Sequence, residues 1–272
     1  MNEELQRKYK NLRGLILSYG SVAVAFSGGT DSTLLVKVAH DVVGERLVAI
    51  TLAGNATPAS VVREARAWAA GEGIDHEVVT FDELTVPEFA ANVPQRCYFC
   101  KKAIFSEIGR VAERKGCAVV ADGSNVDDQG DYRPGLRALA ELGVASPLRD
   151  AGFTKADVRA LSRELGLPTW DMPSAACLAS RFAYGDSITR EKLRRVEAAE
   201  DYLHGLGLVQ VRVRVHGDAG ELARIEVEQE QIARLAKEEV RVQVVERLRE
   251  LGFSYVSLDL TGFRSGAMNE VL

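Results

Sequence analysis

Residues 22–32 read Val22-Ala23-Val24-Ala25-Phe26-Ser27-Gly28-Gly29-Thr30-Asp31-Ser32. The first five residues form an apolar run that is typical of a strand buried in a parallel sheet. A glycine-rich turn follows, and Asp31 opens a helix. The two glycines let backbone N–H groups face inward, and the helix points the positive end of its dipole at the same place. The stretch therefore predicts an anion-binding loop between a strand and a helix.

The hydroxyl groups of Ser27, Thr30 and Ser32 add hydrogen-bond donors to this loop. The sequence contains no G-x-x-x-x-G-K-[ST] pattern, and Gly205-Leu206-Gly207 lacks the third glycine of a dinucleotide fingerprint. Both observations exclude an ordinary P-loop or Rossmann nucleotide site. Taken alone, the loop is also compatible with a plain turn followed by a capped helix.

Strands alternate with helices on either side of the loop. The apolar patterns predict strands over 47–52, 74–81 and 117–121, and helices over 3–19, 58–70 and 99–114. This alternation predicts a doubly wound α/β domain with a parallel sheet. The last strand ends in a second polar turn, Asp122-Gly123-Ser124-Asn125. Because ligands bind beyond the carboxyl ends of such strands, we expect both turns to face one site.

A smaller α+β domain is expected at the C-terminus. Residues 166–187 have no clear period and read as a loop at a domain junction. The patterns beyond it predict helices over 189–206 and 229–251 and strands over 209–216 and 255–260. We therefore expect two domains, 1–180 and 181–272, and a homo-oligomer built with the help of the second.

Composition narrows the class of protein. Hydrophobic residues make up 46% and charged residues 27% of the 272 residues, which is typical of a globular chain. The polar start and the lack of a run of about 18 apolar residues predict a cytoplasmic protein without a membrane span. A net charge of −5 argues against a surface that grips nucleic acid mainly through its phosphates, so a small-molecule partner is expected.

The four cysteines are too few for a disulfide scaffold. Cys117 starts an apolar strand and reads as an inert core residue. Cys97 and Cys100 form a C-x-x-C pair that is compatible with a zinc half-site, a redox pair, cluster ligands or a purely structural role. Cys177 lies in a polar loop close to Arg181, whose guanidinium favours a thiolate, and is a candidate for chemistry.

The strand, Ser-Gly-Gly-x-Asp-Ser and helix sequence resembles the PP-loop of the ATP pyrophosphatase superfamily, and Gly123-Ser124-Asn125-x-Asp127-Asp128 resembles its second motif. The resemblance implies a fold of the adenine-nucleotide alpha-hydrolase type and cleavage of ATP to AMP and pyrophosphate. Ser27, Gly28, Gly29, Thr30 and Ser32 would hold the pyrophosphate, with Gly123, Asn125 and Asp128 completing the nucleotide site. Asp31 would act through Mg²⁺.

Nearly the whole chain resembles the ATP-dependent sulfur transferases called LarE. The residues that carry this resemblance are the two motifs and the stretches 132–139, 176–181, 211–215 and 258–266. It implies adenylation of a carboxylate of pyridinium-3,5-biscarboxylic acid mononucleotide and its conversion to a thiocarboxylate for a nickel-pincer cofactor. In one form of the family, a cysteine matching Cys177 gives up its own sulfur. In a second form, cysteines matching Cys97, Cys100 and Cys177 hold a [4Fe-4S] cluster with a transferable sulfide, and the C-x-x-C pair favours this form here.

Arg212 and Arg214 lie two residues apart on a predicted strand and therefore share a face. With Arg181, this pair is a candidate site for the phosphate of the mononucleotide, although charges exposed to solvent would give the same pattern. Arg195 and Glu200 are expected to be surface charges. Three other functions fit the loop: a tRNA thiolase, a nucleotide sensor without catalysis, and an amide-forming ligase that would leave Cys177 without a task.

Overall fold

The computed structural model describes residues 1–130, 134–173, 176–217, 221–264 and 266–269. By their contacts they form two units, of which the first comprises Met1–Phe81 and Cys97–Ala175 and the second Asp82–Arg96 and Ala176–Leu272. The boundary predicted from the sequence lies after residue 180. Long-range contacts assign Asp82–Arg96 to the second unit, and such contacts leave no local pattern. The extent of independently folding domains stays a prediction.

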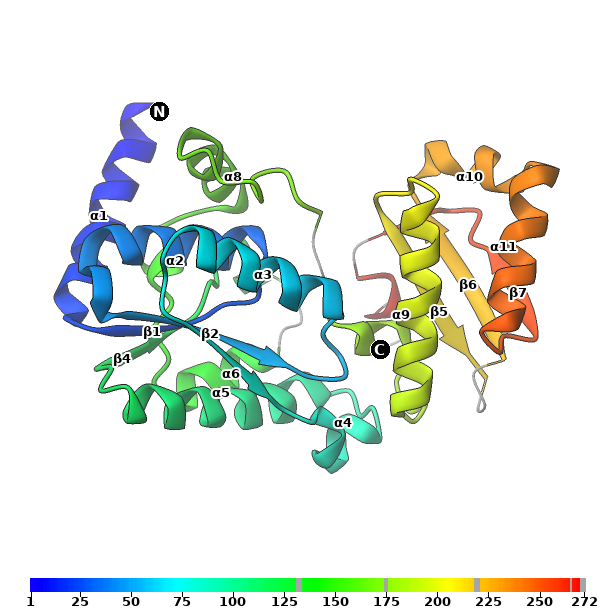
Figure 1. The fold of residues 1–272 in the computed structure, drawn as a ribbon, viewed down its shortest axis with the longest axis horizontal. Helices are drawn as coiled ribbons and strands as arrows, with labels where there is room; N and C mark the ends of the chain where they lie inside the picture. The colour runs from blue at the N-terminus through cyan, green and yellow to red at the C-terminus, as the bar shows by residue number, and fades with distance from the viewer. Residues whose placement is uncertain (131–133, 174–175, 218–220, 265, 270–272) are drawn as a thin grey trace. The chain divides into compact units, whose positions relative to one another are not determined.

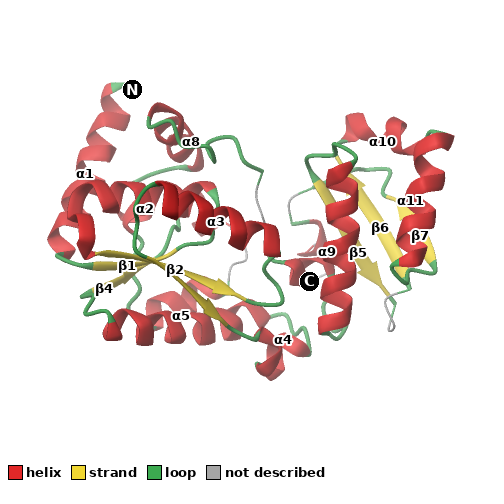
Figure 2. Cartoon of the chain, in the orientation of Figure 1, coloured by secondary structure: helices red, strands yellow, loops and turns green. Residues whose placement is uncertain are grey.

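The first unit is built on a four-stranded sheet (Figures 1 and 2). Its strands are β1 (Val22–Ala25), β2 (Leu47–Ala53), β3 (His76–Thr80) and β4 (Val119–Ala121). They lie in the order β3-β2-β1-β4, and every neighbouring pair is parallel. The chain thus winds outward from β1 through β2 to β3 and then returns to the other side of β1. The carboxyl ends of β1 and β4, where the two polar turns begin, are neighbours at this reversal.

Helices cover both faces of this sheet. One face carries α1 (Glu3–Tyr19), α2 (Thr30–Val43), α3 (Ala59–Gly71) and α8 (Lys155–Glu164), and the other carries α5 (Arg96–Arg114) and α6 (Gly135–Glu141). The alternation along β1 explains the two layers, since Val22 and Val24 join the first core and Ala23 joins the second. The predicted doubly wound α/β fold is confirmed.

The second unit contains a three-stranded sheet of β5 (Val211–His216), β6 (Leu222–Val227) and β7 (Tyr255–Leu258). Strand β6 lies in the middle, antiparallel to β5 and parallel to β7. Its helices are the short α4 (Pro87–Ala90), α9 (Arg190–Gly205), α10 (Gln229–Ala236) and α11 (Glu238–Glu250). The predicted α+β character is confirmed. Among the described residues, none of the helices combines the length and the apolar composition that crossing a membrane requires.

Candidate functional site

The predicted anion loop connects β1 to α2. Gly28 has a φ of +74°, and a β-carbon there would lie 3.3 Å from that of Ala65, so both the backbone conformation and the close approach of α3 favour glycine. Gly29 is the N-cap of α2, and it provides no side-chain acceptor for the first turn of the helix. The N-terminal N–H groups and the positive end of the α2 dipole therefore suit an anionic ligand.

The hydroxyls of Ser27 and Ser32 form hydrogen bonds within the loop. Ser32 donates from Oγ to the carbonyl of Gly29 at 3.1 Å and accepts from the backbone N–H of Ser27 at 3.3 Å. The two serine Oγ atoms lie 3.0 Å apart. A hydroxyl can rotate to a new acceptor, so both side chains can turn to an oxyanion placed at the loop.

The second motif packs directly on the start of α2. A β-carbon on Gly123 would lie 3.1 Å from the backbone nitrogen of Ser32, so the turn after β4 needs glycine to approach the loop this closely. Asn125 donates from Nδ2 to Asp31 Oδ1 at 3.0 Å, and the ammonium of Lys155 pairs with Asp31 Oδ2. The structure thus brings the two predicted motifs together at the carboxyl ends of β1 and β4.

The remaining carboxylates of the second motif hold its turn. Asp128 accepts from the backbone N–H of Asn125 at 2.9 Å, and Asp127 accepts from the backbone N–H of Lys155 at 2.8 Å. Of the predicted loop donors, Thr30 differs from the serines because its hydroxyl donates to the carbonyl of Thr169 at 2.8 Å. This bond ties the loop to the segment after α8.

A cavity of about 240 Å³ lies beside the loop, within the first unit. It is lined by Gly28 and by side chains of α2, α3 and the segment after α8, including Thr33, Trp68 and Thr169. The hydroxyls of Thr33 and Thr169 are buried there without a hydrogen-bond partner in the described part of the chain. The loop therefore has a pocket with both aromatic and polar walls next to its glycines.

Cys97 and Cys100 lie in the first turn of α5, which begins at Arg96. The sequence analysis starts this helix near Phe99, and the earlier start puts the pair inside the helix. Residues three apart share a helix face, and the N-terminal end favours thiolates. Cys97 is exposed and Cys100 is 9% exposed. Burial, followed by the nearby Asp75, raises the pKa of the Cys117 thiol, which agrees with its interpretation as a core residue.

Cys177 belongs to the second unit and precedes the short 3-10 helix η4 (Leu178–Arg181). It is exposed. The buried Arg181 donates from Nη1 to the carbonyls of Ala176 at 2.9 Å and Cys177 at 3.2 Å. Its other nitrogens bind both carboxylate oxygens of Glu200, at 2.9 and 2.8 Å. The guanidinium thereby fixes the backbone on which the thiol stands.

Glu200 is 6% exposed, so its expected place on the surface is wrong. Besides Arg181, it accepts from the backbone N–H of Val213 at 2.8 Å. Helical periodicity could have placed Glu200 on the buried face of α9, one residue after Ala199 and three before Leu203. The side chain of Arg195 packs over the ring of Phe253.

Arg212 and Arg214 are buried, at 7% and 4% exposure. Arg214 donates from Nε and Nη2 to Glu226 at 3.0 and 2.8 Å and from Nη1 to the carbonyl of Ser180 at 2.8 Å. It therefore links the second sheet to the Cys177 segment. Burial, followed by the charge of Arg181, lowers the pKa of Arg212 to about 10.

Charged side chains of both signs lie close to these arginines among the described residues of the second unit. They include four guanidiniums and three carboxylates: Arg181, Arg212, Arg214, Arg224, Glu200, Glu226 and Asp259. Guanidiniums held in place in this way suit an anionic group of a ligand.

The segment before Cys97 is joined to the segment after Cys177. Asn92, fully buried with a φ of +52°, donates from Nδ2 to the carbonyl of Ala183 at 2.6 Å and accepts from the N–H of Gly185 at 3.0 Å. Arg96 donates to the Asn92 side chain and packs over the ring of Tyr184 at 4.7 Å. The residue preceding Cys97 thus belongs to the same packed cluster as the chain that leaves Cys177.

Each unit taken by itself has, among its described residues, no group of three His, Cys, Asp or Glu side chains that could hold a metal ion. The first unit contributes the thiols of Cys97 and Cys100 and the second that of Cys177. Convergence of the three thiols stays a prediction. Of the predicted motif residues, Tyr132, Arg133 and Ser265 lie outside the described residues.

Sequence reasoning missed Lys155, Glu226 and the cluster around Asn92. Lys155 is the first residue of α8 and matches no motif, although the Thr154 capping box marks the start of that helix. Glu226 lies in the unpredicted strand β6, directly opposite Arg212. Asn92 could not be identified because its partners lie about ninety residues further along the chain.

The amino-acid sequence is similar to those of several known proteins. No family model matches the sequence. It is 44% identical to an uncharacterised protein of Synechocystis sp. over 98% of this chain and 99% of that one. It is 41% identical to the pyridinium-3,5-bisthiocarboxylic acid mononucleotide synthase of Lactiplantibacillus plantarum over 92% of this chain and 90% of that one. The tRNA-specific 2-thiouridylase MnmA of Azorhizobium caulinodans is 31% identical over 71% of this chain and 59% of its own length.

Proposed function

The chain belongs to the pyridinium-3,5-bisthiocarboxylic acid mononucleotide synthase family, and from this premise we propose that it activates a carboxylate of pyridinium-3,5-biscarboxylic acid mononucleotide with ATP and replaces a carboxylate oxygen with sulfur. It is an ATP-dependent sulfur-transferring enzyme that serves nickel-pincer cofactor biosynthesis. The observation that carries the proposal is the packing of the two nucleotide motifs against each other at the reversal of the sheet.

The first step is adenylation. A carboxylate oxygen of the substrate attacks the α-phosphorus of ATP, the bond to the β-phosphate breaks, and pyrophosphate leaves. Ser27, Ser32 and the N-terminus of α2 would hold the departing pyrophosphate, and Lys155 beside Asp31 would offset its charge. Hydrogen-bond donors that are already in place where charge develops in the transition state usually make the largest single contribution to catalysis.

A Mg²⁺ ion would be held through Asp31, whose carboxylate is oriented by Asn125 and Lys155. Mg²⁺ is commonly bound by one or two carboxylates together with phosphate oxygens of the substrate. When bound, the ion would neutralise charge on the β- and γ-phosphates. Gly123 and Asn125 would keep the second turn against the loop.

The second step brings in sulfur. In the sacrificial route, the thiolate of Cys177 attacks the acyl carbon of the adenylate, the bond from carbon to the AMP oxygen breaks, and AMP leaves with one oxygen of the original carboxylate. If the sulfur then comes from Cys177 itself, removal of its α-proton breaks the Cβ–Sγ bond, releases the thiocarboxylate and leaves dehydroalanine. The exposed thiol on a backbone held by Arg181 supports this role.

We favour the route in which Cys97, Cys100 and Cys177 hold a [4Fe-4S] cluster, which when bound would supply a transferable sulfide. Two observations support it: the pair shares one face at the start of α5, and Asn92 ties the residue before Cys97 to the chain after Cys177. Iron and sulfide analysis after anaerobic purification, repeated on the Asn92→Ala variant, tests this assignment. Loss of iron from the variant is expected, and a wild-type protein without iron would favour the sacrificial route.

The mononucleotide phosphate would bind at the arginines of the second unit. Arg212 is the residue that a phosphate would help most, because burial and neighbouring positive charge oppose its ionisation. Arg214, which binds Glu226, and Arg181, which binds Glu200, would add positive charge beside it. A small nucleotide substrate, a cytoplasmic location and a homo-oligomer complete the proposal.

The deciding experiment compares the wild type with Cys177→Ala and Cys117→Ala. With ATP and the dicarboxylate mononucleotide, the wild type should release pyrophosphate and form thiocarboxylate. Cys177→Ala should still bind ATP but form no thiocarboxylate, and Cys117→Ala should match the wild type. Thiocarboxylate formation by Cys177→Ala would overturn the assignment, and a wild type that releases no pyrophosphate would instead indicate a sensor.

A tRNA substrate is less favoured. The chain covers only 59% of the length of the 2-thiouridylase, and the net charge of −5 opposes an electrostatic grip on RNA. Tight binding of tRNA that weakens steeply with added salt would reverse this preference.

A further inference from the structure

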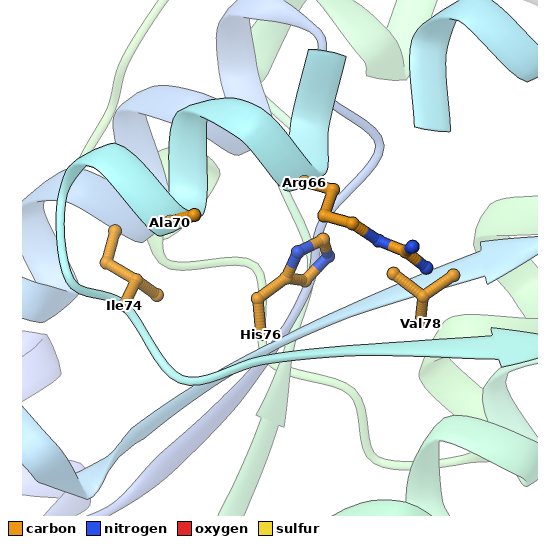
Figure 3. A pocket seen from close by; sticks show the side chains of 5 residues that line it. All are labelled: Arg66, Ala70, Ile74, His76 and Val78. Atoms are coloured by element: carbon orange, nitrogen blue, oxygen red, sulfur yellow. The ribbon is translucent and has the colours of Figure 1, made fainter. Parts of the chain in front are cut away.

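A pocket of about 290 Å³ lies between α3 and β3, apart from the nucleotide motifs (Figure 3). Arg66 and Ala70 of α3 face it from one side, and His76 and Val78 of β3 face it from the other. His76 Nδ1 is buried and has no hydrogen-bond partner in the part of the chain that the structure describes. A buried nitrogen without a hydrogen bond destabilises the folded protein by about 1–3 kcal/mol, so we expect a favourable interaction of the same imidazole.

The other ring nitrogen of His76 forms a hydrogen bond. His76 Nε2 is 2.8 Å from Thr51 Oγ1, and the same hydroxyl lies 2.6 Å from the carbonyl oxygen of Phe26. A hydroxyl has one proton, and the carbonyl can only accept. Thr51 therefore donates to Phe26 and accepts from His76, which assigns the proton of a neutral imidazole to Nε2. The bare nitrogen is then Nδ1, the atom without a partner.

The carbonyl of Phe26 belongs to the first peptide plane of the anion loop. Because that plane is rigid, the direction of this carbonyl also fixes the direction of the Ser27 N–H. The N–H donates to Ser32 Oγ at 3.3 Å, and Ser32 donates to the carbonyl of Gly29 at 3.1 Å. An unbroken chain of donors and acceptors thus runs from the pocket to the loop.

We propose that His76 and Thr51 are positioning residues that set the first peptide plane of the anion loop and thereby its affinity for pyrophosphate. Thr51 is 2% exposed, so water does not replace its bond to Phe26. The Phe26 N–H is already held by the carbonyl of Ile50 at 2.8 Å, which leaves the carbonyl side of the residue as the part that Thr51 controls. The inference rests on the proposed use of the loop for pyrophosphate.

A packing role is the alternative, because the His76 ring also contacts the Phe26 ring edge-on at 5.5 Å. Four substitutions separate the two roles. Thr51→Val and His76→Phe keep shape or ring and remove the hydrogen bond, whereas Thr51→Ser and His76→Gln keep a donor at the same place. Ser162→Ala is the matched control, since it removes another fully buried hydroxyl from this unit that takes no part in the hydrogen bonds between His76 and the loop.

The test measures binding of magnesium pyrophosphate and of AMP by calorimetry on the full-length protein. Thr51→Val should weaken pyrophosphate binding about tenfold and His76→Phe about threefold, in line with the loss of one hydrogen bond, while AMP affinity stays the same. The donor-keeping variants and Ser162→Ala should match the wild type. The double variant His76→Phe/Thr51→Val should be no weaker than Thr51→Val, because His76 acts through Thr51.

Equal losses for pyrophosphate and AMP, or wild-type affinity in Thr51→Val, would overturn the inference. Additive losses in the double variant would also overturn it, because they would show that His76 acts independently. A wild type that binds no pyrophosphate at all would instead contradict the proposed function, so the two failures are distinguishable.

Discussion

Arg212 and Arg214 are two residues apart, yet replacing each with methionine should change stability by different amounts. Methionine keeps much of the buried aliphatic stem and removes the charge. Burial lowers the pKa of Arg212 to about 10, well below the usual value for arginine, which corresponds to about 3 kcal/mol against its charged form. Because the folded pKa is below the unfolded one, this cost is present in full at neutral pH and relaxes only above about pH 10.

Substitution of Arg212 also removes favourable contacts. Its Nη1 donates to the carbonyl of Val211 at 2.7 Å, and its guanidinium lies over the ring of Phe263 at 5.2 Å. Each contact contributes about 1 kcal/mol. We therefore expect Arg212→Met to be much less destabilising than Arg214→Met. Arg214→Met should lower the free energy of unfolding by about 3 kcal/mol, because it removes both hydrogen bonds from Arg214 to the buried Glu226, which keeps its ion pair with Arg224.

Urea unfolding at pH 7.5, followed by circular dichroism, gives both free energies. Both variants should lose affinity for the mononucleotide. For Arg212→Met, this loss would then not be explained by a loss of stability. Equal destabilisation by the two substitutions would refute the charge argument. An Arg212→Met variant that keeps wild-type substrate affinity would refute the phosphate assignment.

Three further predictions concern the first unit. Lys155→Met should lower the rate of ATP cleavage about tenfold by removing the ammonium that would offset the charge of the departing pyrophosphate, and Lys155→Arg should recover most of the rate in a pyrophosphate-release assay. Burial and, secondarily, Arg66 lower the pKa of His76, so its contribution to stability is present above about pH 6.5 and is lost as the pH falls. Thermal unfolding of His76→Gln should therefore vary less with pH below 6.5 than that of the wild type, and identical profiles would contradict this. Cys117 should react with iodoacetamide more slowly than the exposed cysteines because burial raises its thiol pKa, and mass spectrometry of labelled peptides checks this.

The first unit was predictable because β1 and β2 at the centre of its sheet are almost entirely apolar. Parallel strands covered on both faces carry this pattern, and Gly28 marks the turn after the first of them. The adjacency of the two polar turns also followed, since the reversal of strand order puts β4 beside β1.

The second unit was less predictable because it buries charge. Strand β6 alternates apolar residues with Arg224 and Glu226, a pattern that by itself suits a strand with one face in solvent. Glu226 is nevertheless buried, and its pairing with Arg214 of β5 makes this burial tolerable. Glu200 was misjudged for the same reason, because its partner Arg181 lies on another element. Pairing between distant residues leaves no local signal.

In the proposed reaction, the substrate carboxylate attacks the α-phosphate of ATP held at the loop of Ser27 to Ser32. A mononucleotide substrate whose carboxylates are labelled with ¹⁸O tests this step, through mass spectrometry of the AMP formed during thiocarboxylate production. We expect one labelled oxygen in the phosphate of each AMP. AMP without label, or ADP in place of AMP, would contradict it.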